Sequence, residues 1–377
     1  ARAAFALFVV VYRAAGRRRV LMAAPADDPG ARSAALALAQ GFQEIEGAPA
    51  RVAVMDGAEL LPPALAWPVR TLRAGVTRGA WLQRLADRPA RSRRVIRLLS
   101  LLCEPALRHA LRCRQPAAIV SVDPLFGHLL AHASRRLGHP ARFITVITDL
   151  IRVHPLWLCQ QVDLCVAPSP AAEESARAGG VPPARLRQVG LPISPQFNAR
   201  LPNKSEIRRK LGWPQEAAIV LILAGGRRPG RFLQAARAIA RQAPRARLVI
   251  VAGDNERLLA RLRESPWAWA AELHGYADNV PELMVGADLL VTRAGSSVIA
   301  EGLAAGLPML FIGTSRREEA NAAYTVGAGV GVVAREPAQA ALIIAEWLRP
   351  GNPTLAKMAQ RARSLARPQA AEEIARL

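Results

Sequence analysis

Residues 287–301 decide the fold; they read Ala-Asp-Leu-Leu-Val-Thr-Arg-Ala-Gly-Ser-Ser-Val-Ile-Ala-Glu. The apolar run that ends at Thr292 predicts a buried strand, and the Gly-Ser-Ser turn predicts the start of a helix. The first amides of such a helix have no partner within it, and the helix dipole favours negative charge there. We expect Ser296 and Ser297 to cap the helix and to donate hydroxyls to a phosphate. Glu301 lies one turn further on, where a carboxylate can bind two ribose hydroxyls.

Strands and helices alternate on both sides of this stretch, which predicts an α/β protein with parallel sheets covered by helices on both faces. The expected strands are 19–24, 51–55, 117–122, 142–148 and 163–167, then 218–224, 247–252, 287–292, 308–312 and 330–333. The expected helices are 31–46, 91–112, 125–138, 230–242, 255–264, 279–285, 296–305, 317–327, 336–348 and a final helix over 353–376.

The chain of 377 residues is long enough for two domains, and the run Gly190-Leu191-Pro192-Ile193-Ser194-Pro195 predicts the linker between them. The expected parts are an N-terminal domain over 1–190, a hinge over 191–203, a C-terminal domain over 204–350, and a terminal helix over 351–377 that packs back on the N-terminal domain.

The net charge of +22 is almost all arginine, because lysine occurs only at 204, 210 and 357. A GC-rich genome accounts for part of this bias, but the charge still favours anionic partners. The four cysteines lack zinc-like spacing, so we expect no metal site. Residues 3–12 form an apolar run too short to span a bilayer, which we interpret as a peripheral or leader segment.

Further motifs follow the predicted strands of the second half. They are Leu221-Ile222-Leu223-Ala224-Gly225-Gly226, Val251-Ala252-Gly253-Asp254-Asn255, Gly275-Tyr276 through Val280, and Glu318-Glu319-Ala320-Asn321. Together with 292–301 they resemble the donor site of family 28 GT-B glycosyltransferases, which include monogalactosyldiacylglycerol synthases and processive diacylglycerol glucosyltransferases. The resemblance implies a GT-B fold, with two doubly wound Rossmann-like domains facing a cleft. It also implies a UDP-sugar as donor substrate, with no cofactor and no metal.

The resemblance further implies which residues bind the UDP-sugar. They are Gly225, Gly226, Asn255, Tyr276, Val280, Arg293, Gly295, Ser296, Ser297, Glu301, Glu318, Glu319 and Asn321. Family members bind the uracil with backbone groups near Tyr276–Val280. They have a longer glycine run where this chain has Arg227, Arg228 and Pro229. These arginines either add charge-assisted contacts to the diphosphate or block its approach.

The acceptor side resembles the galactolipid-synthase branch of the family. Ile144-Thr145-Val146-Ile147-Thr148-Asp149-Leu150 is followed by His154-Pro155-x-Trp157, similar to that branch's Thr-Asp-Leu and His-Pro-x-Trp elements. Asp149 is expected to orient the acceptor hydroxyl or to accept its proton, and His154 is a second catalytic candidate. Two alternatives stay open: Asp149 caps a turn, and His154 is a packed loop histidine.

The N-terminal element departs from the family. Family members carry a Gly-Gly-Gly-His element after the first strand, and its histidine is the expected general base. Here Gly30 matches, but Ala31 occupies the histidine position. Either Asp28, Asp27 or Asp149 supplies the base, or turnover falls by about 10²–10⁴-fold. The alternative for Asp27 and Asp28 is a solvated turn and N-cap pair.

Segment 67–114 holds twelve arginines against Asp87 and Glu104, with Trp67, Trp81 and several leucines among them. This composition is typical of an interfacial helix on an anionic membrane. The alternative is a helix with one solvated arginine face and one core face. No aromatic platform or recognition motif predicts nucleic-acid binding.

We therefore expect a UDP-sugar-dependent hexosyltransferase that glycosylates a diacylglycerol-like lipid. The expected location is cytoplasmic and peripheral, on the inner face of the plasma membrane. One alternative is a catalytically impaired nucleotide-sugar-binding relative that acts as a scaffold or sensor. The other is a family 28 transferase with a polyisoprenyl-linked or soluble acceptor.

Overall fold

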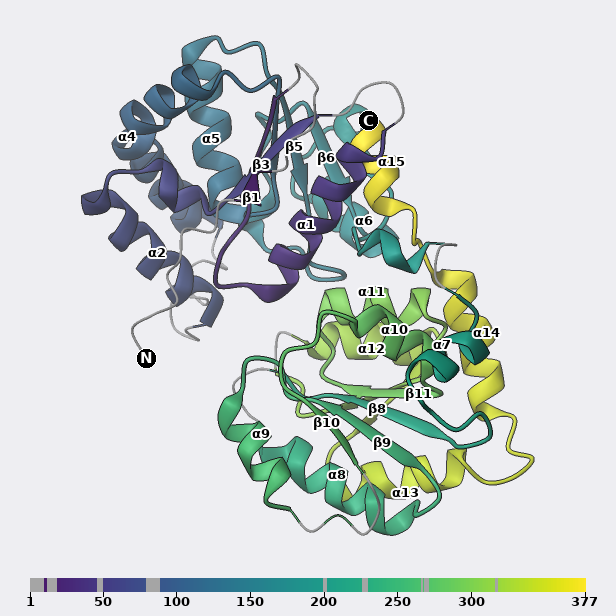
Figure 1. The fold of residues 1–377 in the computed structure, drawn as a ribbon. Helices are drawn as coiled ribbons and strands as arrows, with labels where there is room; N and C mark the ends of the chain where they lie inside the picture. The colour runs from purple at the N-terminus through teal and green to yellow at the C-terminus, as the bar shows by residue number, and fades with distance from the viewer. Residues whose placement is uncertain are drawn as a thin grey trace. The chain divides into compact units, whose positions relative to one another are not determined.

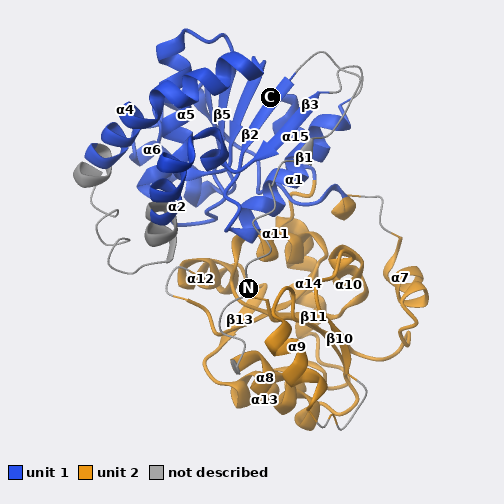
Figure 2. Cartoon of the chain, turned by 60° about the vertical axis from the view of Figure 1, so that its left-hand side comes forward, with its two compact units in different colours: residues 1–195, 369–377 blue, residues 196–368 orange. Residues whose placement is uncertain are grey.

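The computed structural model describes residues 10–11, 19–45, 50–78, 89–198, 202–225, 230–265, 267, 271–315 and 318–377. The chain forms two compact units (Figure 2), each described separately below. Unit 1 comprises residues 1–195 and 369–377, and unit 2 comprises residues 196–368. The boundary therefore falls within the region 191–203 that the sequence marks as a hinge.

Unit 1 contains a seven-stranded sheet in the order β1-β3-β2-β4-β5-β6-β7, with every pair parallel except β1 and β3 (Figure 1). The strands are β1 (Val10–Val11), β2 (Arg19–Ala23), β3 (Arg51–Met55), β4 (Ala118–Ser121), β5 (Arg142–Val146), β6 (Leu164–Ala167) and β7 (Leu186–Gln188). The helices are α1 (Pro29–Gln43), α2 (Pro63–Arg78), α4 (Pro89–Arg114), α5 (Pro124–Leu137), α6 (Pro170–Ala178) and α15 (Ala370–Arg376). Short 3₁₀ turns are η1 (Gly57–Leu60), η2 (Pro155–Trp157) and η3 (Pro183–Arg185).

Three helices of unit 1 start in the same way, which explains where each begins. Asp28, Asp123 and Ser169 are N-caps whose side chains accept backbone amides, and each is followed by a proline at the first helical position. The cap satisfies amides that have no helical partner, and proline has no amide to lose there. These local signals fix α1, α5 and α6 directly after β2, β4 and β6.

The sheet of unit 1 is buried on both faces. Along β2, Leu21 and Ala23 belong to one hydrophobic cluster, while Val20 and Met22 belong to another. Successive side chains of a strand point to opposite faces, so a doubly covered strand is apolar throughout. Parallel strands also end at one common edge, where ligands of open α/β sheets bind.

Unit 2 contains a parallel six-stranded sheet in the order β10-β9-β8-β11-β12-β13. The strands are β8 (Ile219–Leu223), β9 (Arg247–Val251), β10 (Glu272–His274), β11 (Leu289–Thr292), β12 (Met309–Ile312) and β13 (Gly331–Ala334). The helices are α7 (Lys204–Lys210), α8 (Gly230–Gln242), α9 (Glu256–Arg263), α10 (Val280–Gly286), α11 (Ser296–Ala304), α12 (Glu319–Gly327), α13 (Pro337–Trp347) and α14 (Thr354–Leu365). A further 3₁₀ turn, η4 (Pro195–Phe197), lies at the unit boundary.

Two predictions from the sequence were wrong in detail. The expected single helix over 353–376 is two helices, α14 and α15, because Pro368 removes an amide and disfavours helical backbone at the residue before it. The first sheet is not purely parallel, because β1 pairs antiparallel with β3. Val10 and Val11 form this strand, and the rest of the run 3–12, which the sequence predicts to be a peripheral or leader segment, lies outside the described residues.

The terminal helix α15 packs against α1 within unit 1 (Figure 1). A Cβ atom at Gly41 of α1 would lie 2.8 Å from the carbonyl oxygen of Ala371, so glycine permits the close approach. Ala371 and Ile374 are buried in the same hydrophobic cluster as Leu38 and Phe42.

Candidate functional site

The glycine turns of unit 2 lie at the carboxyl edge of its sheet. β8 runs into Gly225, β9 into Gly253, and β11 into Gly295. Gly253 has a φ of +60°, a left-handed conformation that favours glycine, and a Cβ atom there would lie 3.8 Å from the Cα of Gly225. Among the residues that the structure describes, a Cβ atom at Gly225 or Gly295 would meet no atom within 4 Å.

The helix α11 begins at Ser296 with Gly295 as its N-cap, and glycine has no side chain with which to cap it. The prediction that Ser296 and Ser297 cap the helix was therefore wrong, because both serines lie inside its first turn. The first amides at the positive end of a nine-residue helix are a favourable place for an anion. Glu301 lies on the same helix and is half-buried.

Three predicted residues surround this helix start. The Asn321 amide of α12 donates to the carbonyl oxygen of Ala294 at 3.0 Å and to the hydroxyl oxygen of Ser296 at 3.3 Å. Arg293 Nε lies 3.7 Å from Glu318 Oε1, and Glu318 Oε2 accepts the amide of Ser315 at 2.7 Å. Asn321 and Glu318 thus fix the turn 293–296 from the next strand-to-helix connection.

The other predicted donor residues are more dispersed. Asn255 is the N-cap of α9, where its Oδ1 accepts the amide of Leu258 at 3.0 Å. Tyr276 follows β10 and is 72% exposed, and Val280 is the first residue of α10. Glu319 is in the first turn of α12. Gly226, with Arg227, Arg228 and Pro229, lies outside the described residues.

A charged cluster forms around Glu272, the first residue of β10. Glu272 accepts hydrogen bonds from Trp213 Nε1, Arg247 and His274 Nε2, each at 2.8 Å. Burial alone would raise the pKa of Glu272, but the hydrogen bonds from Arg247, His274 and Trp213 outweigh it, and the pKa is lowered. The carboxylate therefore ties β10 to β9 and to the loop after α7.

In unit 1, Asp28 accepts the amides of Gly30 and Ala31 at 3.0 and 3.1 Å, as the N-cap of α1. Ala31 is 4% exposed, so its methyl group is part of the core. The capping interpretation of Asp28 is thus confirmed, and its Oδ1 is engaged in that role. The proton-accepting role of Asp28 stays a prediction.

Asp149 and His154 lie in the connection after β5. The carboxylate Oδ2 of Asp149 accepts Trp157 Nε1 at 2.8 Å and the amide of His154 at 3.3 Å. His154 caps η2, where its Nδ1 accepts the amide of Leu156 at 3.2 Å. Trp157 itself is 3% exposed. The structure therefore joins the two predicted acceptor elements into one turn, with Asp149 at its base.

One histidine beside this turn escaped the sequence analysis. His128 lies in the second turn of α5, a helix that packs against η2. Burial lowers its pKa from 6.5 to about 4, so the imidazole is neutral at pH 7. The sequence could have indicated His128, because this residue follows shortly after Asp123-Pro124, which marks a helix start at the carboxyl end of a strand.

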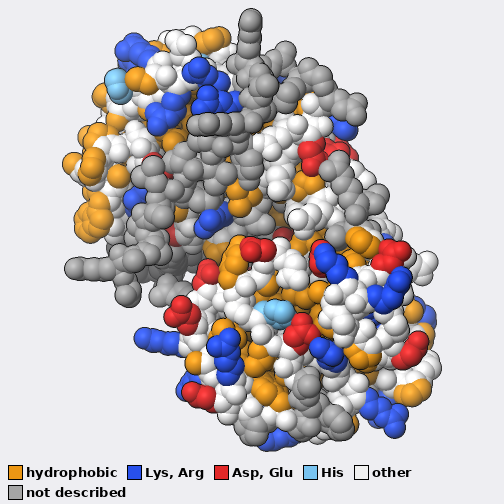
Figure 3. All heavy atoms as spheres, viewed as in Figure 1, with side chains coloured by type: hydrophobic (Ala, Val, Ile, Leu, Met, Phe, Trp, Pro, Cys, Tyr) orange, Lys and Arg blue, Asp and Glu red, His pale blue; other side chains and the backbone are white. Residues whose placement is uncertain are grey.

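The segment 67–114 forms α2 and α4 around residues 79–88, which include Trp81 and lie outside the described residues. On α4, Val95, Leu98, Leu101 and Leu102 are 44–59% exposed, and Trp67 of α2 is 72% exposed. Figure 3 shows hydrophobic side chains at the left margin of unit 1, where Figure 1 places these helices. The acidic Glu104 is buried instead, against Arg108 and His132 at 3.2 Å each.

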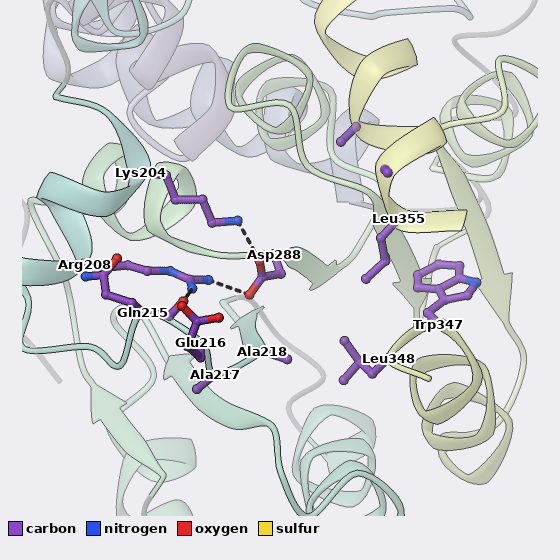
Figure 4. Close-up of a pocket in the computed structure, with 12 residues that line it drawn as sticks. Lys204, Arg208, Gln215, Glu216, Ala217, Ala218, Asp288, Trp347, Leu348 and Leu355 are labelled. Atoms are coloured by element: carbon purple, nitrogen blue, oxygen red, sulfur yellow. Dashed lines mark hydrogen bonds and ion pairs between the residues drawn. The ribbon is translucent and has the colours of Figure 1, made fainter. Parts of the chain in front are cut away.

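A cavity of ≈ 410 Å³ in unit 2 lies at the opposite, amino-terminal end of the strands, beside Ala218 and Asp288 (Figure 4). Asp288 accepts Lys204 Nζ, Arg208 and the amide of Ile219, each at 2.6 Å. Arg208 also donates to the carbonyl oxygens of Gly286 and Gln215. These hydrogen bonds hold α7 against the starts of β8 and β11. The charged side chains that line the cavity therefore stabilise the fold.

Two features of the described residues bear on membrane and metal chemistry. No helix among them is long and apolar enough to cross a membrane. No group of three or more histidine, cysteine or acidic side chains among them is arranged to hold a metal ion.

Two family models match the chain. The monogalactosyldiacylglycerol (MGDG) synthase model matches residues 32–193, and the glycosyltransferase family 28 C-terminal domain model matches residues 219–375. The chain belongs to glycosyltransferase family 28. The MGDG synthase match begins at Arg32, so Asp28 and Ala31 of this family 28 chain lie just outside it.

Curated relatives agree with this family. A probable MGDG synthase of Nicotiana tabacum is 33% identical over 270 residues, which cover 69% of this chain and 50% of the relative. MGDG synthase 1 of Arabidopsis thaliana is also 33% identical over 270 residues, covering 69% of this chain and 51% of the relative. The family 28 chain therefore spans about half the length of these relatives.

Solved structures give the fold of this family 28 chain. MurG of Acinetobacter baumannii is 14% identical with a TM-score of 0.63, and 95% of this chain and 98% of that chain are covered. Anabaena HepE, solved with UDP-glucose, is 16% identical with a TM-score of 0.57 and the same coverage. The predicted GT-B fold, with two Rossmann-like domains, is confirmed.

Proposed function

We propose that this chain transfers a hexose from a UDP-sugar to a diacylglycerol-type lipid at a membrane surface. The observation that carries the proposal is the start of α11, which has a glycine N-cap and is flanked by Asn321 and Arg293. Amides, a helix dipole and a guanidinium within one turn are the groups that bind a diphosphate. The names of the curated relatives, MGDG synthases, supply the lipid class.

In this proposal unit 2 binds the donor. The α11 amides and Arg293 neutralise the UDP that leaves as the bond from the sugar to the diphosphate breaks, so the scheme requires no metal and no cofactor. Glu301 accepts two hydroxyls of the ribose. Backbone groups between Tyr276 and Val280 bind the uracil, and Glu318, Glu319 and Asn321 contact the sugar and diphosphate side.

Unit 1 binds the acceptor hydroxyl near Asp149. A carboxylate that is oriented by the Trp157 indole and the His154 amide keeps one geometry, which general-base catalysis requires. As the hydroxyl oxygen attacks the sugar carbon, its proton passes to Asp149. His154 supports this geometry as the cap of η2.

The α4 face formed by Val95, Leu98, Leu101 and Leu102 supports the membrane part of the proposal. Arg94 and Arg97 beside it are exposed, and the only acidic residue of α4, Glu104, is buried. Apolar side chains bordered by arginine suit an anionic leaflet. We place the reaction at the inner face of the plasma membrane, where the net charge of +22 favours an acidic surface.

The test is turnover of UDP-galactose and UDP-glucose with diacylglycerol, a polyisoprenyl-linked acceptor and a soluble acceptor, beside a calorimetric titration with UDP. We expect transfer to diacylglycerol in anionic vesicles and saturable UDP binding. Transfer to one of the other acceptors alone would replace the lipid assignment while leaving the donor assignment in place.

A second candidate function rests on Ala31. The family histidine is absent, and the alanine that replaces it is 4% exposed in the core at the start of α1. A nucleotide-sugar-binding scaffold or sensor would need the donor site but no base. UDP binding without turnover of any acceptor would select this function.

A further inference from the structure

The segment 275–280 of unit 2 follows β10 directly, and the proposed function uses its backbone to bind the uracil. Its tyrosine, Tyr276, is 72% exposed. Backbone groups bind a ligand tightly only if the chain that carries them already keeps one conformation, because ordering a loose segment costs conformational entropy. The contacts that hold this segment without a ligand therefore bear on donor affinity.

The strand β10 by itself is a weak support for this segment. It has three residues, all half-buried, and among the described strands it pairs with β9 alone. The carbonyl oxygens of His274 and Gly275 accept the amides of Ala252 and Gly253 at 2.9 and 3.1 Å. Few backbone bonds and little burial make a short edge strand prone to local opening.

Side chains on one face of β10 add a second restraint. Glu272 and His274 are two positions apart, so they point to the same face. His274 Nε2 lies 2.8 Å from Glu272 Oε1, while Glu272 Oε2 accepts Trp213 Nε1 and Arg247, each at 2.8 Å. The lowered pKa of Glu272 keeps its carboxylate ionised at pH 7, so the carboxylate only accepts and Nε2–H of His274 is the donor.

The two ends of β10 are thus held by different bonds. Trp213 and Arg247 lie outside β10 and fix Glu272, the first residue of the strand. His274 is the last residue of the strand and bonds this fixed carboxylate, directly before Gly275. A valine or isoleucine would suit a strand here. What the imidazole adds is an N–H that ties the end of the strand.

We infer that His274 is a positioning residue of the donor site. Its bond to Glu272 fixes the end of β10 and, with it, the backbone of 275–280. The effect should be confined to the uracil side, because the proposed diphosphate site is the start of α11, on a different strand-to-helix connection. The ligand in this inference rests on the proposed function, whereas the restraint on 275–280 does not.

The test compares substitutions at His274 with a control in the same unit. His274→Leu removes the N–H, and His274→Gln places an amide N–H close to the position of Nε2. His274→Val, which suits a strand, serves if the leucine variant does not fold. Lys210→Met is the matched control, because it removes a 2.7 Å ion pair between Lys210 of α7 and Glu282 of α10.

The first readout needs no ligand. Amide hydrogen exchange, followed by mass spectrometry, reports the local opening of 275–280. We expect this segment to exchange about tenfold faster in His274→Leu, and close to the wild-type rate in His274→Gln and Lys210→Met. The central strand β8 should keep its wild-type rate. Unchanged exchange of 275–280 in His274→Leu would overturn the inference, as would equal acceleration in β8.

The second readout separates the two parts of the donor. Calorimetric titrations with UDP and with pyrophosphate should show the Kd for UDP rising about fivefold to tenfold in His274→Leu, with recovery in His274→Gln. The Kd for pyrophosphate should stay within about twofold. A parallel loss of both affinities would indicate general damage to unit 2 and reject the positioning role. If the wild-type protein does not bind UDP, the proposed function fails, and hydrogen exchange alone decides the role of His274.

Discussion

Trp157 Nε1 donates a 2.8 Å hydrogen bond to Asp149 Oδ2, across the connection between β5 and η2. The indole is 3% exposed, so the bond lies in a region of low dielectric, where it is stronger than in water. This relationship explains why the two acceptor motifs of the sequence occur together: one presents the carboxylate and the other orients it.

Replacing Asp149 by asparagine should separate orientation from proton transfer. The asparagine oxygen can still accept the Trp157 N–H, so the fold should persist, but the amide cannot hold the acceptor proton. We expect kcat to fall about 10²–10⁴-fold with UDP affinity unchanged. The comparison is Asp28→Asn, which remains a good N-cap and should retain both stability and turnover. Full activity of Asp149→Asn would exclude Asp149 as the base.

Glu301→Ala should weaken UDP binding at least tenfold in a calorimetric titration. A carboxylate that binds two ribose hydroxyls makes charge-assisted hydrogen bonds worth about 1.5–3 kcal/mol each. The matched control is Glu282→Ala, since Glu282 forms a surface ion pair with Lys210 in the same unit. Equal affinity of both variants and the wild type would remove Glu301 from the site.

Replacing both Leu98 and Leu101 by aspartate should reduce binding to anionic vesicles in a sedimentation assay. The two leucines are 59% and 56% exposed on α4, so the change adds negative charge without emptying the core. Wild-type binding should also fall with salt, because each arginine near a charged leaflet contributes about 1 kcal/mol. Leu342→Asp is the control, since Leu342 is 60% exposed on α13 of unit 2. If the control loses as much binding as the α4 variant, the α4 face is not the contact.

The wild-type protein should lose stability between pH 6.5 and pH 4 in part through His128. Burial lowers the pKa of His128 from 6.5 to about 4 in the folded state, so the unfolded chain binds its proton first as the pH falls. The stability is therefore complete above pH 6.5 and is lost as the pH approaches 4, by at most about 3 kcal/mol. Urea unfolding at pH 7 and pH 4.5 measures this loss, and His128→Phe should show a smaller one. An identical pH dependence of the unfolding free energy in the wild type and in His128→Phe would contradict this role of His128.

Much of the fold could be predicted from local patterns. The helix 230–242 is found as predicted, and β3 coincides with the expected strand 51–55. The strand β10 escaped prediction because its three residues, Glu272–His274, are half-buried and polar at both ends. Its place in the sheet depends on the hydrogen bonds that Glu272 accepts from Trp213 and Arg247.

The sequence by itself determined the order of strands and helices, the linker region and the glycine turns, because these depend on side-chain period and on backbone freedom within a few residues. Only the tertiary structure decided which polar groups meet. Asn321 reaches Ala294 across 27 positions, and Arg208 reaches Asp288 across 80. It also decided that Gly295 rather than Ser296 is the N-cap of α11, which places Ser296 inside the first turn. The physical reason is that hydrogen bonds between distant segments form only once the sheet has brought the ends of its strands to one edge.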